Sequence, residues 1–462
     1  MTPGVAELAR AFQNGTATPA EATAACLASI EANDHVLAAW QVVYGEQAQA
    51  SADAATAAIE HGHRVGPFHG MPFALKDIVD VDGRITTGGT AAWRDRVSPA
   101  TATIGRRLLA AGGTLLGKTK TVEFALGGWG TNQHMGTPRN PWGAEAHHVP
   151  GGSSSGSGVA VSSGMAPCAI GTDTGGSVRL PASLCGIVGL KTTEGLLPTD
   201  GIVPLSHTLD TPGPMARSVE DVALMFDVLT GRNQVDIDND WQQTAGLYEQ
   251  LRRGVAGMRL GALSDSERAL TTSAVLADYD RAIDQLSKLG AVIEVFEAPL
   301  PFDEMKEMAF VIVTAEAYHH HGELFENVDA PLDEAVRKRG LPGKNITAVE
   351  YIGAQLRRRD DQAEFAAALK GFDALLTPTT PDTAPPLAGV DEDSTPAHFT
   401  RAGNYLGLCG LSLPIGVTDG GLPTSLQIMG RANAEALVLR IGSAYEEARG
   451  VFPSPPLAVG VA

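Results

Sequence analysis

Two glycine-rich segments that contain serine, together with one distant lysine, are the residues of this chain that could carry out acyl transfer. The first segment is Gly151–Gly158, the second is Asp173–Arg179, and Lys76 follows a short apolar stretch. A serine hydroxyl is a weak nucleophile at neutral pH and needs an adjacent base. A lysine can be that base if burial lowers its pKa. The apolar stretch favours this role for Lys76, and the alternative is an ordinary ion pair with Asp77 or Asp80.

The second segment has the composition of a loop that points several backbone N–H groups at one position. Such a loop forms an anion-binding concavity, and its glycines let a carbonyl carbon approach the backbone closely. We therefore expect residues 174–177 (Thr174, Gly175, Gly176 and Ser177) to hold the oxyanion of a tetrahedral intermediate. We expect Asp173 and Arg179 to hold this loop by hydrogen bonds or an ion pair. Contact of Arg179 with a substrate carboxylate is the alternative.

The first segment partly matches two further motifs. It has the pattern Gly-x-Ser-x-Gly around Ser154, but residues 147–150 do not have the pattern of the strand that this hydrolase motif requires. A Walker phosphate loop would end in Gly-Lys-Ser or Gly-Lys-Thr, and no lysine follows Gly156. A flexible linker is disfavoured because apolar residues follow at once. A loop that only makes turns, or an anion-binding module without turnover, stays open.

The composition is typical of a soluble globular protein. The chain has 462 residues, is 44% hydrophobic and carries a net charge of −19, the opposite sign from a nucleic-acid-binding surface. No apolar run approaches the roughly 20 residues that span a bilayer, and the N-terminus does not resemble a secretory signal. Cys26, Cys168, Cys185 and Cys409 form no Cys-x-x-Cys pair, and the adjacent His319–His321 cannot all face one ion from a helix. We expect a cytoplasmic protein without metal or cofactor, whose direct partners include neither nucleic acid nor membrane.

Alternating helix and strand patterns predict an α/β domain. A capping box at Thr18–Glu21 opens the first expected helix, and Ser218 caps another. The segment 388–395 is expected to be a mobile surface loop. Expected helices cover residues 18–32, 45–61, 103–111, 159–163 onward, 219–230, 272–289, 347–371 and 434–449. Expected strands cover residues 71–81, 114–117, 167–171, 186–191, 258–263, 291–296, 374–378, 411–417 and 423–429, with 258–296 forming a βαβ-like unit and the last two strands paired.

These segments resemble the amidase signature family. The resemblance is specific over residues 150–192 and is also carried by Gly70–Asp77, with weaker similarity over nearly the whole chain, including 376–381 and 421–427. It implies a Ser-cisSer-Lys triad. In this triad Ser177 is the acylated nucleophile, Ser153 is the bridging serine in a cis peptide, and Lys76 is the base.

The same resemblance implies further features of the site and the fold. It places the oxyanion donors on residues 174–177 and a pocket edge on Gly127, Gly128 and Trp129, while Ser154 supports the site beside Asp173 and Arg179. It implies one large α/β domain over residues 1–462, in which helices wrap a mixed central β-sheet and the signature core covers about 65–230. Where members often have Pro-Val-Gly-Leu-Gln, this chain has Pro423–Gln427, which affects only pocket or partner details.

The implied activity is hydrolysis of a linear small-molecule amide through an acyl-enzyme. The alternative within the family is the glutamine-hydrolysing A subunit of a tRNA-dependent amidotransferase. A homodimer is compatible with the sequence.

Overall fold

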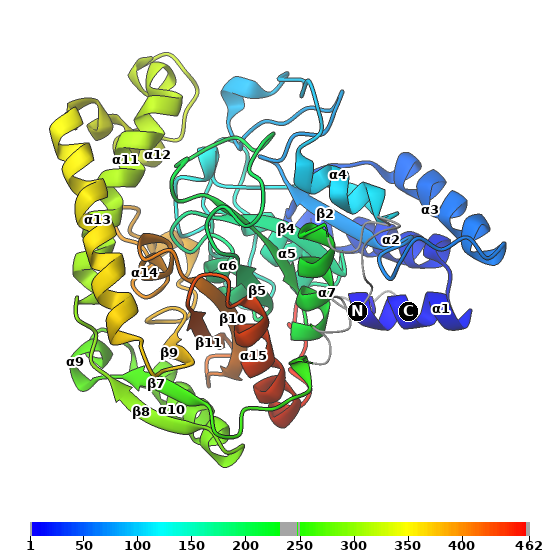
Figure 1. The fold of residues 1–462 in the computed structure, drawn as a ribbon. Coiled ribbons are helices and arrows are strands. Elements are labelled where there is room, and N and C mark those ends of the chain that lie inside the picture. Colours follow the sequence, from blue (N-terminus) through cyan, green and yellow to red (C-terminus); the bar gives the residue numbers. More distant parts are fainter. Residues whose placement is uncertain (1, 232–246, 248–249, 459–462) are drawn as a thin grey trace.

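One mixed β-sheet runs through the part of the chain described by this computed structural model, which is residues 2–231, 247 and 250–458 (Figure 1). The predicted domain of residues 1–462 extends beyond these ranges. In spatial order the strands are β1 (Trp40–Val43), β3 (Thr114–Thr119), β2 (Pro72–Lys76), β4 (Cys168–Asp173), β6 (Thr211–Ala216), β5 (Val188–Lys191), β10 (Cys409–Val417), β11 (Pro423–Gly430), β9 (Ala374–Pro378), β7 (Arg259–Leu263) and β8 (Val292–Phe296). Strand pairs are parallel around β2 and around β7, and antiparallel in the middle of the sheet from β4 to β9.

Helices surround this sheet, which confirms the predicted α/β class (Figure 1). The α-helices are α1 (Val5–Asn14), α2 (Pro19–Leu37), α3 (Gly45–Glu60), α4 (Thr103–Ala110), α5 (Ser155–Ser162), α6 (Arg179–Leu184), α7 (Val219–Leu229), α9 (Asp265–Arg268), α10 (Ser273–Lys288), α11 (Phe302–Glu326), α12 (Glu334–Gly340), α13 (Ala348–Ala368), α14 (Thr400–Tyr405) and α15 (Glu435–Arg449). Short 3₁₀ helices cover η1 (Ala91–Trp93), η2 (Glu123–Ala125), η3 (Leu341–Asn345) and η4 (Leu387–Gly389). Among the described helices, none combines the length and apolar character needed to cross a bilayer.

The predicted capping box at the start of α2 is present. The Thr18 hydroxyl accepts from the Glu21 N–H, and the Glu21 carboxylate accepts from the Thr18 N–H. The helix continues to Leu37, five residues beyond its expected end. The expected stop at Asn33 and Asp34 was wrong because both side chains support the helix. Asn33 donates to the Ser29 carbonyl at 2.8 Å, and Asp34 accepts from the N–H of Ala39, just past the helix end, at 2.6 Å.

The elements that went unpredicted include α11 and β6. The α11 sequence is apolar on several sides, which hides the helical period. In β6, Pro212 and Pro214 remove two backbone donors and Gly213 offers no side chain, which all argue against a strand. Gly213 is required there because a Cβ would lie 2.1 Å from the Leu190 carbonyl oxygen of the neighbouring strand. The predicted βαβ-like unit and the pairing of β10 with β11 are confirmed.

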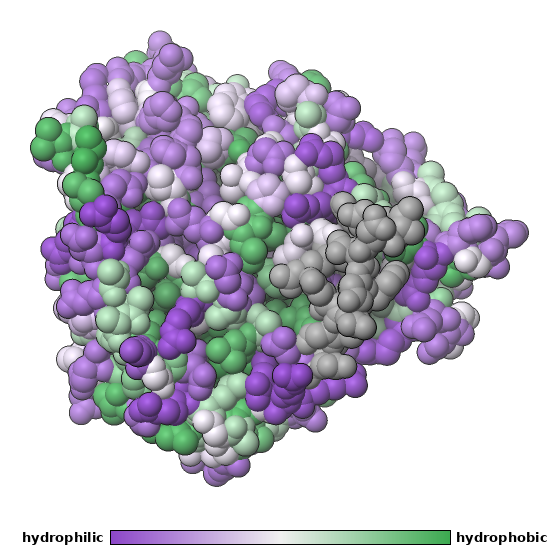
Figure 2. All heavy atoms as spheres, viewed as in Figure 1, coloured by the Kyte–Doolittle hydropathy of each residue, from purple (hydrophilic) through white to green (hydrophobic). Residues whose placement is uncertain are grey.

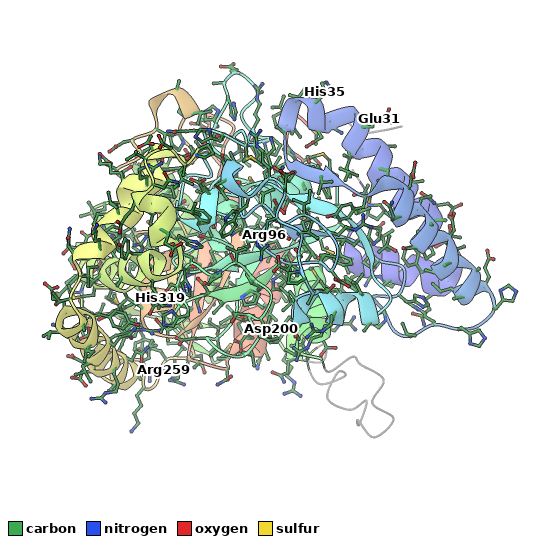
Figure 3. The ribbon with its side chains drawn as sticks, turned by 90° about the horizontal axis from the view of Figure 1, so that it is seen from above. Glu31, His35, Arg96, Asp200, Arg259 and His319 are labelled. Atoms are coloured by element: carbon green, nitrogen blue, oxygen red, sulfur yellow. The ribbon has the colours of Figure 1, made fainter. Side chains whose placement is uncertain are left out.

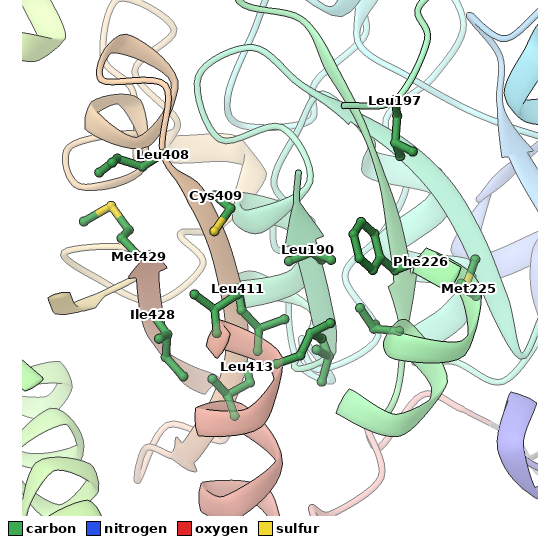
Figure 4. Packing of buried hydrophobic residues seen from close by; sticks show 14 of the residues in the cluster. Leu190, Leu197, Met225, Phe226, Leu408, Cys409, Leu411, Leu413, Ile428 and Met429 are labelled. Atoms are coloured by element: carbon green, nitrogen blue, oxygen red, sulfur yellow. The ribbon is translucent and has the colours of Figure 1, made fainter. Parts of the chain in front are cut away.

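The hydrophobic core lies between the centre of the sheet and the helices that pack on it. Figure 4 shows Leu411 and Leu413 of β10 beside Leu190 of β5, with Met225 and Phe226 of α7 nearby. All of these side chains are buried. Hydrophilic residues cover most of the face seen in Figure 2, with hydrophobic residues in small groups between them. The sheet is thus a rigid base on which strand ends can hold polar groups.

One edge of the sheet collects the residues of interest. Strands β2 and β4 are parallel neighbours, with Ala74 opposite Ala169 and Leu75 opposite Ile170. Their carboxyl ends therefore meet at the same edge, where α/β proteins commonly bind ligands. Lys76 is the last residue of β2, and Asp173 is the last residue of β4. The second glycine-rich segment begins at that point and leads into α6.

Candidate active site

The Lys76 amine is buried and contacts two hydroxyl groups. Its Nζ donates to Ser153 Oγ at 2.7 Å and to Thr172 Oγ1 at 2.9 Å. The ion pairs expected as the alternative for Lys76 are instead made by other cations, since Asp77 pairs with Lys118 and Asp80 with Arg96. Burial lowers the pKa of Lys76 to about 7, against the opposing charges of Asp210 and Asp173. Much of this lysine is therefore a neutral amine near neutral pH.

The first serine segment holds Ser153 through its backbone. The Gly152–Ser153 peptide bond is cis, the configuration that the family resemblance implies. The Ser153 carbonyl accepts from the Val122 N–H at 3.2 Å and from Thr121 Oγ1 at 3.0 Å. Helix α5 begins two residues later, at Ser155. These contacts fix the backbone on either side of the hydroxyl that meets Lys76.

Ser154 joins the two glycine-rich segments, as expected of a supporting residue. Its N–H donates to the Ser177 carbonyl at 3.3 Å. Its hydroxyl accepts from the Thr172 N–H at 3.2 Å and lies 3.3 Å from the Thr172 carbonyl. The same residue therefore links the end of β4, the loop of Ser177 and the loop of Ser153.

A buried ion pair supports the second segment from below. Arg179 Nη2 lies 2.9 Å from Asp173 Oδ1, and both side chains are fully buried. Burial alone would raise the pKa of Asp173, but the charges of Arg179 and Lys191 and several hydrogen bonds hold it well below its ordinary value. Arg179 also donates to Gln427 Oε1 at 2.6 Å and Asn404 Oδ1 at 2.7 Å. Arg179 is thus fully buried and paired with Asp173, which favours a supporting role over contact with a substrate carboxylate.

The backbone donors of residues 174–177 are not equivalent. The Gly176 N–H donates to Asp173 Oδ1 at 2.7 Å, so this donor is already used to shape the loop. Within the described part of the chain, the N–H groups of Gly175 and Ser177 have no protein acceptor, which leaves them available to a ligand. Gly176 has φ +131°, and a Cβ there would lie 2.3 Å from Thr400 Oγ1. Only glycine fits this position.

Thr172 and Asp210 belong to the site but were not predicted. The Asp210 carboxylate accepts from the Thr174 hydroxyl and from the N–H groups of Leu205 and Ser206. Burial raises the pKa of Asp210 to about 6, while these hydrogen bonds and the charge of Lys76 oppose the rise. Thr172 could have been found from the parallel register of β2 and β4. Asp210 carries no sequence signal, because it lies in no motif and only the fold brings it near Lys76.

A cavity of about 400 Å³ opens beside Ser177. This size is suited to a small molecule. Ser177 is 7% exposed and forms part of the wall. The wall also includes Thr174 and Gly175, the predicted pocket-edge residues Gly127 and Gly128, and Arg339, Glu392, Asp393, Ser394, Thr395 and Arg401. The expected surface loop 388–395 thus supplies part of the wall.

Trp129, which was predicted for the pocket edge together with Gly127 and Gly128, does not line the cavity, and neither does Phe124. Trp129 packs against Val149, Leu184 and Ala384, and its Nε1 donates to the Ser394 carbonyl at 3.1 Å. It supports the loop that forms the wall rather than the wall itself. Phe124 is fully buried and stacks on His321 with ring centroids 4.1 Å apart, so it belongs to the core.

The three adjacent histidines point in different directions. His321 is buried against the Pro204 carbonyl at 2.7 Å, whereas His319 is exposed. Burial lowers the pKa of His321 to about 4, which keeps it neutral. Among the described residues, no group of three His, Cys, Asp or Glu side chains is arranged to hold a metal ion. The four cysteines are buried and unpaired.

Comparisons with known proteins place this arrangement in a family. The Amidase family profile matches residues 21–439. The 2-amino-5-chloromuconic acid deaminase of Comamonas testosteroni is 36% identical over 446 residues, covering 92% of this chain and 93% of the relative. The A subunit of the glutamyl-tRNA(Gln) amidotransferase of Symbiobacterium thermophilum is 37% identical, covering 83% of each chain. The peptide amidase of Stenotrophomonas maltophilia superposes with a TM-score of 0.84 at 31% identity, covering 98% of each chain.

The chain therefore belongs to the amidase family, and its α/β fold matches that of solved amidases. Its reaction class is hydrolysis of C–N amide bonds, and small-molecule amides are the substrates of the family.

The ion pair beneath the nucleophile loop gives a stability prediction. Arg179→Met leaves the buried Asp173 carboxylate without its guanidinium, and we expect the free energy of unfolding to fall by about 3–5 kcal/mol. Arg259→Met is the matched control, because this arginine pairs with Glu294 at the surface and points outward in Figure 3. The control should change stability little. Guanidinium denaturation of both variants measures the difference, and equal losses would contradict the role given to Arg179.

Proposed function

We propose that this protein hydrolyses a small linear carboxylic amide through an acyl-enzyme on Ser177, with Ser153 as proton relay and Lys76 as base. The observation that carries the proposal is the 2.7 Å contact between Lys76 Nζ and Ser153 Oγ, made by a buried amine whose pKa is lowered to about 7. The cavity beside Ser177 gives the substrate a place, and the N–H groups of Gly175 and Ser177 supply oxyanion donors.

The proton follows one route in both directions. Ser177 Oγ attacks the carbonyl carbon, its proton passes to Ser153 Oγ, and the Ser153 proton passes to the neutral Lys76 amine. The C–N bond breaks as the Lys76 ammonium returns a proton through Ser153 to the leaving nitrogen. Water then attacks the Ser177 ester, and the carboxylic acid is released. Apart from the substrate and one water molecule, every step uses groups of this chain.

The similarity to the Symbiobacterium thermophilum amidotransferase subunit supports a second candidate, in which the same site releases ammonia from glutamine. Such a protein would act with partner subunits. Assays of the purified chain without partners separate the two candidates. Turnover of simple amides by the single chain favours the hydrolase, whereas turnover of glutamine that depends on added partners favours the amidotransferase subunit.

Substitution of the nucleophile and of the base should have different effects on amides and esters. Ser177→Ala should abolish turnover of both, because no acyl-enzyme forms. Lys76→Ala should lower kcat/KM for an amide by about 10²-fold more than for its aryl ester analogue. An amine must be protonated as it leaves, whereas an aryl oxide leaves unassisted. Equal losses for amide and ester in Lys76→Ala would show that Lys76 does not protonate the leaving group.

The serine segment offers a matched pair of variants for the relay. Ser153→Ala should lower kcat/KM for amides by about 10²-fold or more, the scale of lost acid–base assistance. Ser155→Ala removes a hydroxyl two residues away that lies 3.5 Å from the Lys120 carbonyl and is given no proton in the mechanism. Its effect should be much smaller. Small and similar effects of the two variants would mean that the segment is only a turn.

The pKa of Lys76 sets the expected pH dependence. The base must be neutral, and its lowered pKa of about 7 means that kcat/KM should rise with pH through neutrality and level off above it. The Asp210 charge raises this pKa, so Asp210→Asn should move the rising limb to lower pH. The two groups are coupled, so the limb belongs to the pair. A maximum near pH 5, or a shift of the limb to higher pH in Asp210→Asn, would contradict this assignment.

A further inference from the structure

One wall of the cavity beside Ser177 holds an arginine that pairs with no carboxylate of the described chain. Arg401 lies on α14 and lines the cavity together with Gly175 and Ser177. Its Nε is buried and makes no hydrogen bond to any described residue. Across the described residues, no carboxylate lies within ion-pair distance of its guanidinium, and burial together with the neighbouring Arg339 lowers the pKa of Arg401 to about 10. A charge held in this way is costly unless something pairs with it.

The guanidinium faces the loop of the nucleophile. A Cβ built on Gly175 would lie 3.3 Å from Arg401 Nε and 3.6 Å from its Nη2. Its position is fixed from α14, because Thr400 Oγ1 donates to the Gly175 carbonyl at 2.8 Å and Asn404 Nδ2 donates to Asp173 Oδ1 at 2.9 Å. A group that meets Arg401 therefore lies beside the oxyanion donors.

The other cations of the wall already have partners. Lys338 pairs with Asp393, Arg339 pairs with Glu392, and Lys306 pairs with Asp303. Arg401 is thus the cation of this wall that has no carboxylate partner among the described residues. It lies in a chain of net charge −19, whose overall field disfavours anions.

We infer that Arg401 binds a carboxylate on the acyl part of the substrate, so that the substrate class is the monoamides of short dicarboxylic acids. This inference rests on the proposed function and specifies its substrate. A planar guanidinium matches a carboxylate with two parallel hydrogen bonds. A singly charged group suits the cavity better than a phosphate, because Glu307, Glu392 and Asp393 also line it.

The chain geometry limits the length of the substrate. Gly175 is two residues before Ser177, so their Cα atoms are separated by at most about 7 Å. A substrate with up to about four methylene groups between its amide carbon and its carboxylate can span this distance. Succinamate, glutaramate and adipamate are monoamides within this limit.

The first experiment compares each monoamide with the neutral amide in which a methyl group replaces the carboxylate. The wild-type protein should prefer at least one anionic amide by about 10- to 100-fold in kcat/KM, the range for a hydrogen-bonded charged group. In Arg401→Met the preference for the anionic amide should be lost. In Arg401→Lys it should fall only in part, because lysine keeps the positive charge but lacks the two parallel N–H donors of the guanidinium. Arg359→Met removes the same charge from the exposed face of α13 and should keep the preference.

A binding measurement separates this inference from the proposed function. Calorimetric titration of Ser177→Ala with the preferred monoamide requires no turnover, and binding should weaken by a similar factor in the double variant with Arg401→Met. If the wild type turns over neutral amides and shows no preference for anionic ones, the inference is overturned and the proposed function stands. If binding depends on Arg401 but the wild type turns over no amide, the inference is supported and the proposed function is overturned. Preference retained in Arg401→Met, or binding unaffected by that substitution, would overturn the inference.

Discussion

The buried pair of Asp173 and Arg179 is the interaction on which the rest of the site depends. Asp173 ends β4, and its carboxylate accepts from the N–H of Gly176 as well as from the guanidinium. The two carboxylate oxygens of Asp173 thereby fix both the turn before Ser177 and the start of α6. Such a pair is stable in a low-dielectric interior only when its remaining hydrogen-bonding groups are also satisfied. Asn404 and Gln427 meet that condition from a distant part of the chain.

This arrangement explains how a buried lysine can be largely neutral near neutral pH, as the proposed mechanism requires of Lys76. Lys118 is also buried, but it lies 3.5 Å from the Asp77 carboxylate. Lys76 instead meets neutral hydroxyls, and the nearby Asp173 charge is already matched by Arg179. Burial therefore outweighs the opposing charges of Asp210 and Asp173, and the pKa of Lys76 falls to about 7. The ion pair of Asp173 with Arg179 and the lowered pKa of Lys76 are therefore electrostatically linked.

The sequence marks the proposed catalytic residues more clearly than the residues around them. Lys76, Ser153 and Ser177 lie in glycine-rich or apolar segments whose composition already indicates unusual backbone, and the structure brings the Lys76 amine to the Ser153 hydroxyl. Helices with clear caps, such as α2 and α13, were also predictable from local residues. In contrast, β6 contains two prolines and is a strand only because β4 and β5 pair with it.

The residues that sequence reasoning missed share one physical property. Asp210, Arg401 and Asn404 act through contacts with segments far away in the chain, and no local pattern marks them. Gly127 and Gly128 were predicted for the pocket edge and line the cavity. Trp129 was predicted with them but does not line it, and its indole N–H instead donates to the Ser394 carbonyl. A side chain's exact direction follows from tertiary packing, which a motif does not contain.

The order in which the ribosome makes the chain determines when the support for the loop of Ser177 is complete. A ribosome has completed Lys76, Ser153 and Ser177 long before it reaches Asn404 and Gln427, which satisfy Arg179. A nascent chain that ends before α14 would hold the three proposed catalytic side chains, but its Arg179 would lack two of its hydrogen-bond acceptors. The polar partners of Arg179 are therefore complete only after β11 has been made. Synthesis from the N-terminus thus adds the support for the loop of Ser177 well after Ser177 itself.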